Sequence, residues 1–205
     1  MGMKPYIIVD FGCNHEGDPS RCFRAIEMAK KSGADAIKFQ HYIPAELFPV
    51  KPEREKWELP KHVWEMISEM CHKGKLDWGV SLLCSTWNLA PWFLELGVKF
   101  LKVASREIKV WPTITKEISC PWWIISTGYL GDVQLWPVST ETKIFDSGIN
   151  FTMLACKSEY PCKTPPLSRI RPGLIEGYSC HTPGDWACKA AVSQGAIVLE
   201  KHLTL

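Results

Sequence analysis

Residues 19–41 read PSRCFRAIEMAKKSGADAIKFQH and combine a helix pattern with a strand pattern. Phe23, Ile26 and Met28 recur at close to helical spacing, and Gly33 is a typical residue for ending a helix. The run from Ala34 to His41 is short and almost continuously apolar, as expected for a strand covered on both faces of a parallel sheet. The stretch therefore predicts one helix–strand unit of an α/β fold.

Apolar runs of the same kind recur along the whole chain, and most are rich in Val, Ile and aromatic residues. The runs are YIIVDF (6–11), ADAIKFQH (34–41), WGVSLLCST (78–86), FLKVASRE (100–107), WWIISTG (122–128), FTMLACKSEY (151–160), LIEGYSCHT (174–182) and AIVLEKHLT (196–204). Helical patterns lie between several of them, at 19–32, 60–73, 89–96, 112–118 and 184–194. Eight strand signals alternating with helices predict one compact (β/α)8 TIM barrel over residues 1–205.

Two parts of this predicted barrel are incomplete. The segment 129–150 should contain the fifth helix, but Pro137 and the Ser/Thr cluster at 139–142 interrupt it, so we expect a shortened helix. The sequence also stops at Leu205, directly after the eighth run, so no eighth helix is expected. The outer faces of the first and eighth strands would then be exposed. Exposed apolar patches usually mark interfaces, which predicts a homo-oligomer or a partner chain.

Composition and charge exclude several classes of protein. Apolar residues make up 46% and charged residues 22%, as in ordinary globular proteins. The 24 basic and 22 acidic residues are scattered, which argues against a nucleic-acid partner. No apolar run is long enough to cross a membrane, and no export signal is visible, so we expect a cytoplasmic protein. The nine cysteines include no Cys-x-x-Cys pair, which predicts packed, reduced thiols rather than a structural zinc site.

Polar residues follow nearly every apolar run. In a parallel barrel the carboxyl ends of all strands meet on one face, where active sites lie. Polar residues could simply mark each change from strand to loop, but this does not explain Lys38 and Lys102, which sit inside apolar runs. A buried lysine is costly unless it meets an anion, which favours a site for an anionic ligand. The polar residues are Asp10, Lys38, Gln40, His41, Ser85, Thr86, Lys102, Ser105, Glu107, Ser126, Thr127, Ser158, Glu159, Tyr160, Ser179, His181, Glu200, Lys201 and His202.

Two histidines end neighbouring runs of the predicted barrel. His181 follows the seventh run and His202 the eighth. Two imidazoles at adjacent strand ends can hold one divalent metal and leave positions open for water and substrate. They can equally be two unrelated histidines, and the pattern alone leaves both interpretations open.

Several motifs together resemble a known family. The segments VDFGCNHEGD (9–18), GADAIKFQ (33–40), STWN (85–88), LKVASREI (101–108), ISTG (125–128), CKSEYP (156–161), GYSCHT (177–182) and EKHLT (200–204) occur in this order. Over positions 6–204 the sequence resembles the barrel domain of the sialic acid synthase (N-acetylneuraminate synthase) family. The resemblance implies a cytoplasmic transferase of sialic acid biosynthesis. It would condense phosphoenolpyruvate with an N-acyl amino-sugar, N-acetylmannosamine or its 6-phosphate, with Mn²⁺ or Mg²⁺ activating the sugar aldehyde, and release phosphate.

The resemblance also implies roles for particular residues. His181 and His202 would be the metal ligands, and Asp10 stands where the family has a glutamate that acts on the sugar or the attacking water. Gln40, Glu107 and Tyr160 would face the sugar. The residues that would bind phosphoenolpyruvate or otherwise contact substrate are Lys38, Thr86, Lys102, Ser105, Ser126, Ser158 and Ser179.

Some positions depart from the family pattern. Asp10 is one methylene shorter than the family glutamate, Cys180 replaces an aspartate before the metal histidine, and Arg106 replaces a glycine. Family members continue into a C-terminal domain resembling antifreeze proteins, which lends an arginine to the partner subunit's sugar site. Two alternatives therefore stay open: a phosphoenolpyruvate- and metal-binding module that needs a partner chain, and a related synthase for another aldose.

Overall fold

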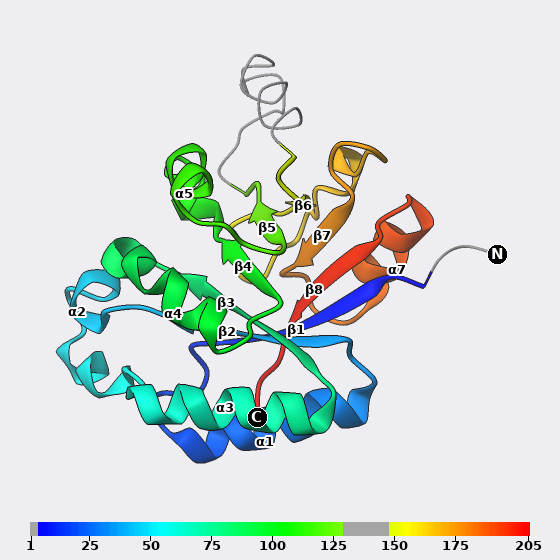
Figure 1. The fold of residues 1–205 in the computed structure, drawn as a ribbon. Coiled ribbons are helices and arrows are strands. Elements are labelled where there is room, and N and C mark those ends of the chain that lie inside the picture. Colours follow the sequence, from blue (N-terminus) through cyan, green and yellow to red (C-terminus); the bar gives the residue numbers. More distant parts are fainter. Residues whose placement is uncertain (1–3, 129–147) are drawn as a thin grey trace. The chain divides into compact units, whose positions relative to one another are not determined.

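Eight parallel strands close into a barrel in the order β1 to β8 (Figure 1). The computed structural model describes residues 4–128 and 148–205. The predicted TIM-barrel fold is confirmed, with one strand at each of the eight apolar runs. The strands are β1 (Tyr6–Gly12), β2 (Ala36–His41), β3 (Asp77–Leu82), β4 (Phe100–Val103), β5 (Trp123–Ser126), β6 (Phe151–Ala155), β7 (Gly177–Cys180) and β8 (Val198–His202).

All five predicted helices are present, with each end within two residues of its predicted position. The α-helices are α1 (Pro19–Ser32), α2 (Pro44–Leu47), α3 (Lys61–Gly74), α4 (Ala90–Glu95), α5 (Trp111–Glu117) and α7 (Trp186–Ser193). The 3₁₀ turns are η1 (Pro52–Trp57), η2 (Cys84–Leu89), η3 (Ser105–Glu107) and η5 (Leu167–Arg169). The segment 129–150, predicted to contain the shortened fifth helix, lies outside the described residues except for 148–150, which are not helical. Residues 203–205, which follow β8, are not helical.

Several predicted strands were too long. β3 ends at Leu82 because the chain turns into η2, where Cys84 adopts a φ of 58°. β6 ends at Ala155, five residues before the predicted end. The turns α2 and η1 were not predicted, although each has a proline in its first turn, which is a favoured place for that residue. Among the described residues between β6 and β7, the only helical segment is η5.

Contacts divide the chain into two compact units. The N-terminal unit comprises Tyr6–Lys102 with Lys201–Leu205, and the C-terminal unit comprises Val103–Glu200 with Met1–Pro5. The side-chain contacts below all lie within one unit or the other. The single domain expected over residues 1–205 stays a prediction.

Strand register explains which side chains of the N-terminal unit face the barrel interior. The ring of Phe39 on β2 packs edge-on against Trp64 of α3, so Phe39 points outward. Its neighbours Lys38 and Gln40 point the other way, because successive residues of a strand alternate. Pairing aligns Asp10, Lys38 and Gly79 at one level, and Gln40, Ser81 and Lys102 at the next. Two levels of mostly polar residues therefore face the interior.

The same reasoning applies to the C-terminal unit. Tyr178 and Cys180 of β7 pack in one apolar cluster with Ala187 and Ala191 of α7, so they face outward. Ser179, between them, faces the interior. Leu154 on β6 pairs with Gly177, and a Cβ at Gly177 would lie 2.1 Å from the Leu154 side chain. Glycine here leaves room for the packing of the inner leucine.

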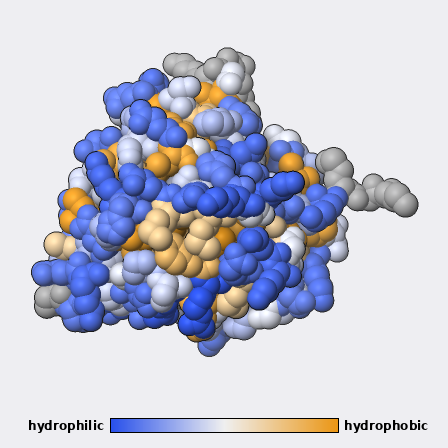
Figure 2. Space-filling model, turned by 60° about the horizontal axis from the view of Figure 1, so that its bottom comes forward, coloured by the Kyte–Doolittle hydropathy of each residue, from blue (hydrophilic) through white to orange (hydrophobic). Residues whose placement is uncertain are grey.

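The face shown in Figure 2 is mostly hydrophilic, with a group of apolar residues near its centre and smaller apolar areas around it. Met28 of α1 and Met66 of α3 are the exposed large apolar side chains of these two helices. Within the described part of the chain, no helix has the length and apolar character needed to cross a membrane. The nine cysteines, all within the described residues, form no disulfide with one another, and five of them are buried. The predicted oligomer or partner chain and the cytoplasmic location stay predictions.

Candidate functional site

A buried ion pair lies inside the N-terminal unit. The Nζ of Lys38 is 2.8 Å from Oδ2 of Asp10, and both side chains are about 2–3% exposed. The two residues are direct partners in the β1–β2 pairing. Taking two charges out of water is costly, so such a pair needs further polar partners or a ligand. The other carboxylate oxygen of Asp10, Oδ1, is buried and forms no hydrogen bond with any residue in 4–128 or 148–205.

Gly12 keeps the space beside this carboxylate open. A Cβ at position 12 would lie 3.3 Å from Oδ1 of Asp10 and 3.4 Å from Oε1 of Gln40. The backbone at Gly12 also has a φ of 56°, which L-residues rarely adopt. Acceptor oxygens of Asp10 on β1 and Gln40 on β2 therefore lie next to a space that any side chain at position 12 would fill.

The next level of the barrel interior adds a second buried lysine. Lys102 is 3% exposed and pairs in register with Ser81. The Ser81 hydroxyl is fully buried, and no described residue forms a hydrogen bond with it. Burying an ammonium group is costly, and an anionic ligand is one kind of partner that would offset this cost.

His202 joins the same site from the end of β8. Its Nδ1 lies 3.5 Å from Oδ2 of Asp10, and its side chain is 32% exposed. The backbone fixes this approach, since the Leu203 N–H donates to the Asp10 carbonyl at 2.9 Å. The Asn14 amide in turn donates to the Leu203 carbonyl at 2.7 Å. With Nδ1 turned toward a carboxylate, the ring lone pair belongs on Nε2.

His15 shapes the loop that follows β1. Its Nδ1 accepts a hydrogen bond from the Gly17 N–H at 3.1 Å, and its side chain is 1% exposed. Burial lowers the pKa of His15 to about 4, so the ring is neutral at pH 7. This contact agrees with a loop-shaping role rather than a catalytic one.

The Thr86 hydroxyl forms hydrogen bonds within the turn that follows β3. The hydroxyl donates to the Leu83 carbonyl at 2.8 Å and accepts from the Leu83 N–H at 3.0 Å. These contacts close the first turn of η2. The expected contact between Thr86 and phosphoenolpyruvate stays a prediction.

Two serines of the C-terminal unit form a small polar cradle around Gly128. The Gly128 N–H donates to the Ser105 hydroxyl at 2.9 Å. A Cβ at Gly128 would lie 2.6 Å from Oγ of Ser158 and 2.7 Å from Oγ of Ser105. Three segments that follow β4, β5 and β6 thus bring hydroxyl and amide groups to one point. Glu107 is half-buried in η3 beside this cradle, whereas Arg106 is exposed.

Ser179 and Glu200 form a second buried polar pair. The Ser179 hydroxyl donates to Oε1 of Glu200 at 2.7 Å, and both side chains are 3% exposed. Ser126, predicted to bind substrate, also has a buried hydroxyl that lacks a hydrogen-bond partner within the described part of the chain. The sequence pattern noted Glu200 as a strand-end residue but assigned it no role. A charged residue in the apolar run AIVLEKHLT was the available signal.

His181 is held in a defined orientation at the end of β7. Its Nδ1 lies 2.7 Å from the Lys157 carbonyl oxygen, which requires the proton on Nδ1. Its Nε2 therefore accepts from the Tyr160 hydroxyl at 2.6 Å, and the two rings stack with centroids 3.8 Å apart. The Cys156 sulfur lies 3.9 Å from Nε2. Tyr160, predicted to face the sugar, is 65% exposed above this histidine.

The predicted site residues thus gather within each unit. Asp10, Lys38, Gln40 and His202 form one group; Ser105 and Ser158 form another; His181 lies with Tyr160, and Ser179 with Glu200. The two predicted metal ligands belong to different units. Within residues 4–128 and 148–205, no three His, Cys, Asp or Glu side chains form a group that could hold a metal by themselves.

Comparisons with known proteins agree with the sequence motifs. A model of the NeuB family matches residues 25–205. The N,N'-diacetyllegionaminic acid synthase of Campylobacter jejuni is 31% identical over 98% of this chain and 68% of its own length. The human N-acetylneuraminate-9-phosphate synthase is 33% identical over 100% of this chain and 63% of its own length. The chain therefore spans about two thirds of the length of these relatives.

Solved structures give the same result. The crystal structure of the N-acetylneuraminic acid synthetase of Leptospira borgpetersenii superposes with a TM-score of 0.85 at 27% identity. It covers 98% of this chain and 74% of that protein. A spore coat polysaccharide biosynthesis protein E from Chromobacterium violaceum, 21% identical with a TM-score of 0.83, shares the fold.

Proposed function

We propose a function on one premise: this chain belongs to the NeuB family. It is the barrel of a nonulosonic acid synthase, which condenses phosphoenolpyruvate with N-acetylmannosamine or its 6-phosphate and releases phosphate. The observation that carries the proposal is the buried Asp10–Lys38 pair, with Lys102 at the next level of the same barrel interior. An anionic ligand would offset the cost of burying lysine side chains in that position.

Phosphoenolpyruvate supplies such an anion through its phosphate and carboxylate groups. Lys38 and Lys102 offer buried ammonium groups, which make stronger hydrogen bonds to oxyanions than neutral donors do. The hydroxyls of Ser105 and Ser158 at Gly128 offer a second set of polar contacts. Donors of this kind stabilise the charge that develops as phosphate leaves.

Asp10 is the group placed to handle a proton. In the proposed reaction, C3 of phosphoenolpyruvate forms a bond to the aldehyde carbon, water adds at C2, and the C2–O bond to phosphate breaks. Oδ1 of Asp10 has no hydrogen-bond partner among the described residues and lies beside the open space at Gly12. It can accept the proton from the attacking water or bind a sugar hydroxyl. Lys38 keeps this carboxylate oriented through Oδ2.

A divalent metal, Mn²⁺ or Mg²⁺, belongs to the same proposal. Both histidines fit a ligand role, because Nδ1 faces an oxygen in each: the Lys157 carbonyl for His181 and the Asp10 carboxylate for His202. In each histidine, the contact at Nδ1 leaves Nε2 as the metal-binding atom, which is the usual arrangement in metal sites. When bound, the metal acts as a Lewis acid on the sugar carbonyl oxygen. The Tyr160 hydroxyl, which bonds Nε2 of His181, has to turn away, and its exposed ring can do so.

Phosphate release tests the proposal directly. The purified chain is given phosphoenolpyruvate, Mn²⁺ and each of a panel of aldoses, and inorganic phosphate is measured. We expect sugar-dependent release that is lost with a chelator and in His181→Ala. The matched control His62→Ala, at an exposed position of α3, retains it. Binding of phosphoenolpyruvate without release for any aldose supports the alternative of a binding module, and release that survives both treatments contradicts the metal role.

A further inference from the structure

The segment between β2 and α3 holds an arginine in an unusual environment. Cζ of Arg54 lies 4.3 Å from the centre of the Phe48 ring and 4.4 Å from the centre of the Trp57 ring. The two rings are inclined at 73° with centroids 6.0 Å apart, so they form a corner that holds the guanidinium. Cation–π contacts of this kind fix the group without using its N–H donors.

Among the described residues, no acceptor engages the N–H donors of Arg54. Across residues 4–128 and 148–205, the contacts of the Arg54 guanidinium are the two aromatic rings, with no ion pair or hydrogen bond. Arg21 differs, because it pairs with Glu16 at 2.7 Å. A guanidinium has five N–H donors arranged in a plane. Arg54 therefore presents a fixed, half-buried set of donors without an acceptor.

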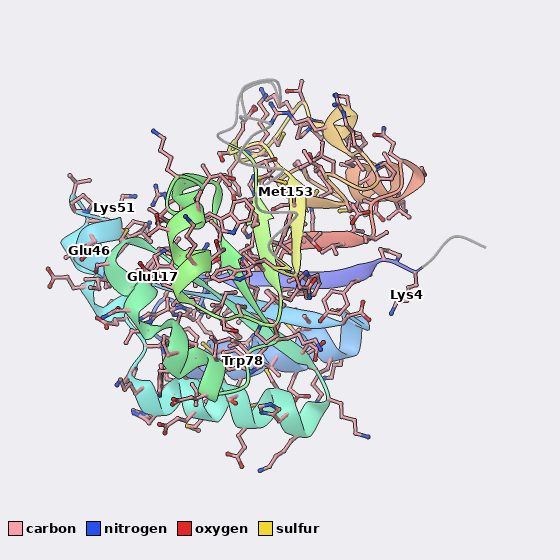
Figure 3. All side chains as sticks on the ribbon, turned by 45° about the horizontal axis from the view of Figure 1, so that its top comes forward. Lys4, Glu46, Lys51, Trp78, Glu117 and Met153 are labelled. Carbon is pink, nitrogen blue, oxygen red and sulfur yellow. The ribbon has the colours of Figure 1, made fainter. Side chains whose placement is uncertain are left out.

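The segment that carries Arg54 is tied to the rest of the N-terminal unit. The Glu46 carboxylate accepts hydrogen bonds from the Ser85 N–H at 3.1 Å and the Ser85 hydroxyl at 2.8 Å. Phe48 packs edge-on against Tyr42, the residue directly after β2, at 5.7 Å. Figure 3 labels Glu46 and Lys51, which locate this segment. These contacts hold the aromatic corner in place before any ligand arrives.

The segment also lies against the loop that follows β1. A Cβ at Gly17 would come 2.1 Å from the Lys56 carbonyl oxygen, so η1 touches this loop directly. Burial and then the charge of Asp10 raise the pKa of the Cys13 thiol, and the charges of Arg54 and Lys38 oppose that shift. Arg54 thus lies in electrostatic range of a residue that also senses the Asp10–Lys38 pair. Its place is at the carboxyl ends of β1 and β2.

We propose that Arg54 is an anion subsite that binds a phosphate monoester on the aldose, so that the acceptor sugar of this chain is phosphorylated. The inference rests on the proposed function and adds the class of sugar. The planar N–H edge of arginine matches phosphate oxygens in a two-point contact. Lys38 and Lys102 are buried inside the barrel, whereas Arg54 is half-buried in the 3₁₀ turn η1. That position suits the far end of an extended sugar phosphate better than phosphoenolpyruvate.

Kinetics with paired substrates test this inference. kcat/KM is measured for N-acetylmannosamine 6-phosphate and for N-acetylmannosamine, in the full chain and in Arg54→Gln. We expect Arg54→Gln to reduce kcat/KM for the phosphorylated sugar by about 10- to 100-fold, the range for a charge-assisted hydrogen bond. The value for the unphosphorylated sugar stays the same. Arg54→Lys keeps the charge but loses the planar donors, so its loss is intermediate.

Binding measurements separate this inference from the proposed function. Calorimetry gives the Kd of N-acetylmannosamine 6-phosphate and, in a separate titration, of phosphoenolpyruvate. Loss of sugar-phosphate affinity in Arg54→Gln, with phosphoenolpyruvate affinity unchanged, supports the subsite even if the chain does not turn over. Arg24→Gln, an exposed position on α1, is the matched control and retains wild-type binding.

Two results overturn the inference. One is an equal loss for the phosphorylated and unphosphorylated sugars, which would make Arg54 a structural residue. The other is weaker binding of phosphoenolpyruvate in place of the sugar phosphate, which would assign Arg54 to the other substrate. A circular dichroism melt of each variant shows that it is folded. Substituting Phe48→Leu, which opens one side of the aromatic corner, should reproduce part of the Arg54→Gln effect.

Discussion

Breaking the Asp10–Lys38 pair should destabilise the fold strongly. Lys38→Met removes the ammonium group 2.8 Å from the Asp10 carboxylate, while that carboxylate stays about 97% buried. The remaining contact, with His202 at 3.5 Å, is too long to replace it. Leaving one charge of a buried pair without its partner costs about 3–5 kcal/mol. We therefore expect Lys38→Met to lower the free energy of unfolding by about 3 kcal/mol.

A double-mutant cycle isolates the pair from other effects of the substitution. Asp10→Asn in the Lys38→Met background removes the unpaired charge, so the double variant should be about 2 kcal/mol more stable than the sum of the single variants predicts. Urea unfolding at pH 7, followed by tryptophan fluorescence, provides each free energy. Lys73→Met at the exposed Lys73–Glu69 pair is the control and should leave the free energy of unfolding close to that of the wild type, because exposed ion pairs contribute little. Additive single variants, within about 0.5 kcal/mol, would refute the coupling.

Three further predictions concern burial and glycine. Burial lowers the pKa of His41 to about 4, so the unfolded state binds this proton first as pH falls and stability declines between about pH 6.5 and 4. At pH 5 the neutral buried ring of His41 lowers the free energy of unfolding by about 2 kcal/mol relative to pH 7. His41→Phe should remove this part of the pH dependence in urea unfolding, and an unchanged pH dependence contradicts the prediction. Gly12→Ala and Gly33→Ala should each cost about 1–2 kcal/mol, because alanine is strained in the left-handed backbone conformation that both glycines adopt. The two variants should therefore have similar melting temperatures. Only Gly12→Ala should lose phosphate release, because Gly33 has open space around it. Gly128→Ala has no such strain and should weaken phosphoenolpyruvate binding in calorimetry by displacing the Ser158 hydroxyl; unchanged affinity would remove the serine cradle from the site.

The sequence predicted the strands well because buried parallel strands leave a simple signal. Short apolar runs appear wherever both faces of the sheet are covered, and each run contained a strand. The ends were less predictable, since apolar residues continue into the turns. Leu83, for example, extends the third run, but Thr86 closes a turn on its backbone. Hydrogen bonds of this kind depend on geometry that hydropathy does not contain.

The site was predictable only in part, for a related reason. Asp10, Lys38 and His202 were recognisable as ionisable residues at strand ends, and register brought them together. Ser179 and Glu200 pair because both side chains point into the barrel from β7 and β8. No local sequence pattern shows this orientation. Arg54 lies in a loop, where the signal was two aromatic residues flanking a basic one. Solvated loops that bind nothing also contain a basic residue between aromatic residues. This sequence pattern therefore indicates a site only when the geometry of the two rings is known.

The product of the reaction tests the central claim most directly. The full chain is incubated with phosphoenolpyruvate, Mn²⁺ and N-acetylmannosamine or its 6-phosphate, and the mixture is analysed by mass spectrometry with phosphate measured in parallel. The account predicts a condensed α-keto acid, the mass of both substrates plus water minus phosphoric acid, formed in equal molar amount to phosphate and lost in Asp10→Ala. Phosphate released without a condensed product, or a product formed equally well by Asp10→Ala, would contradict it.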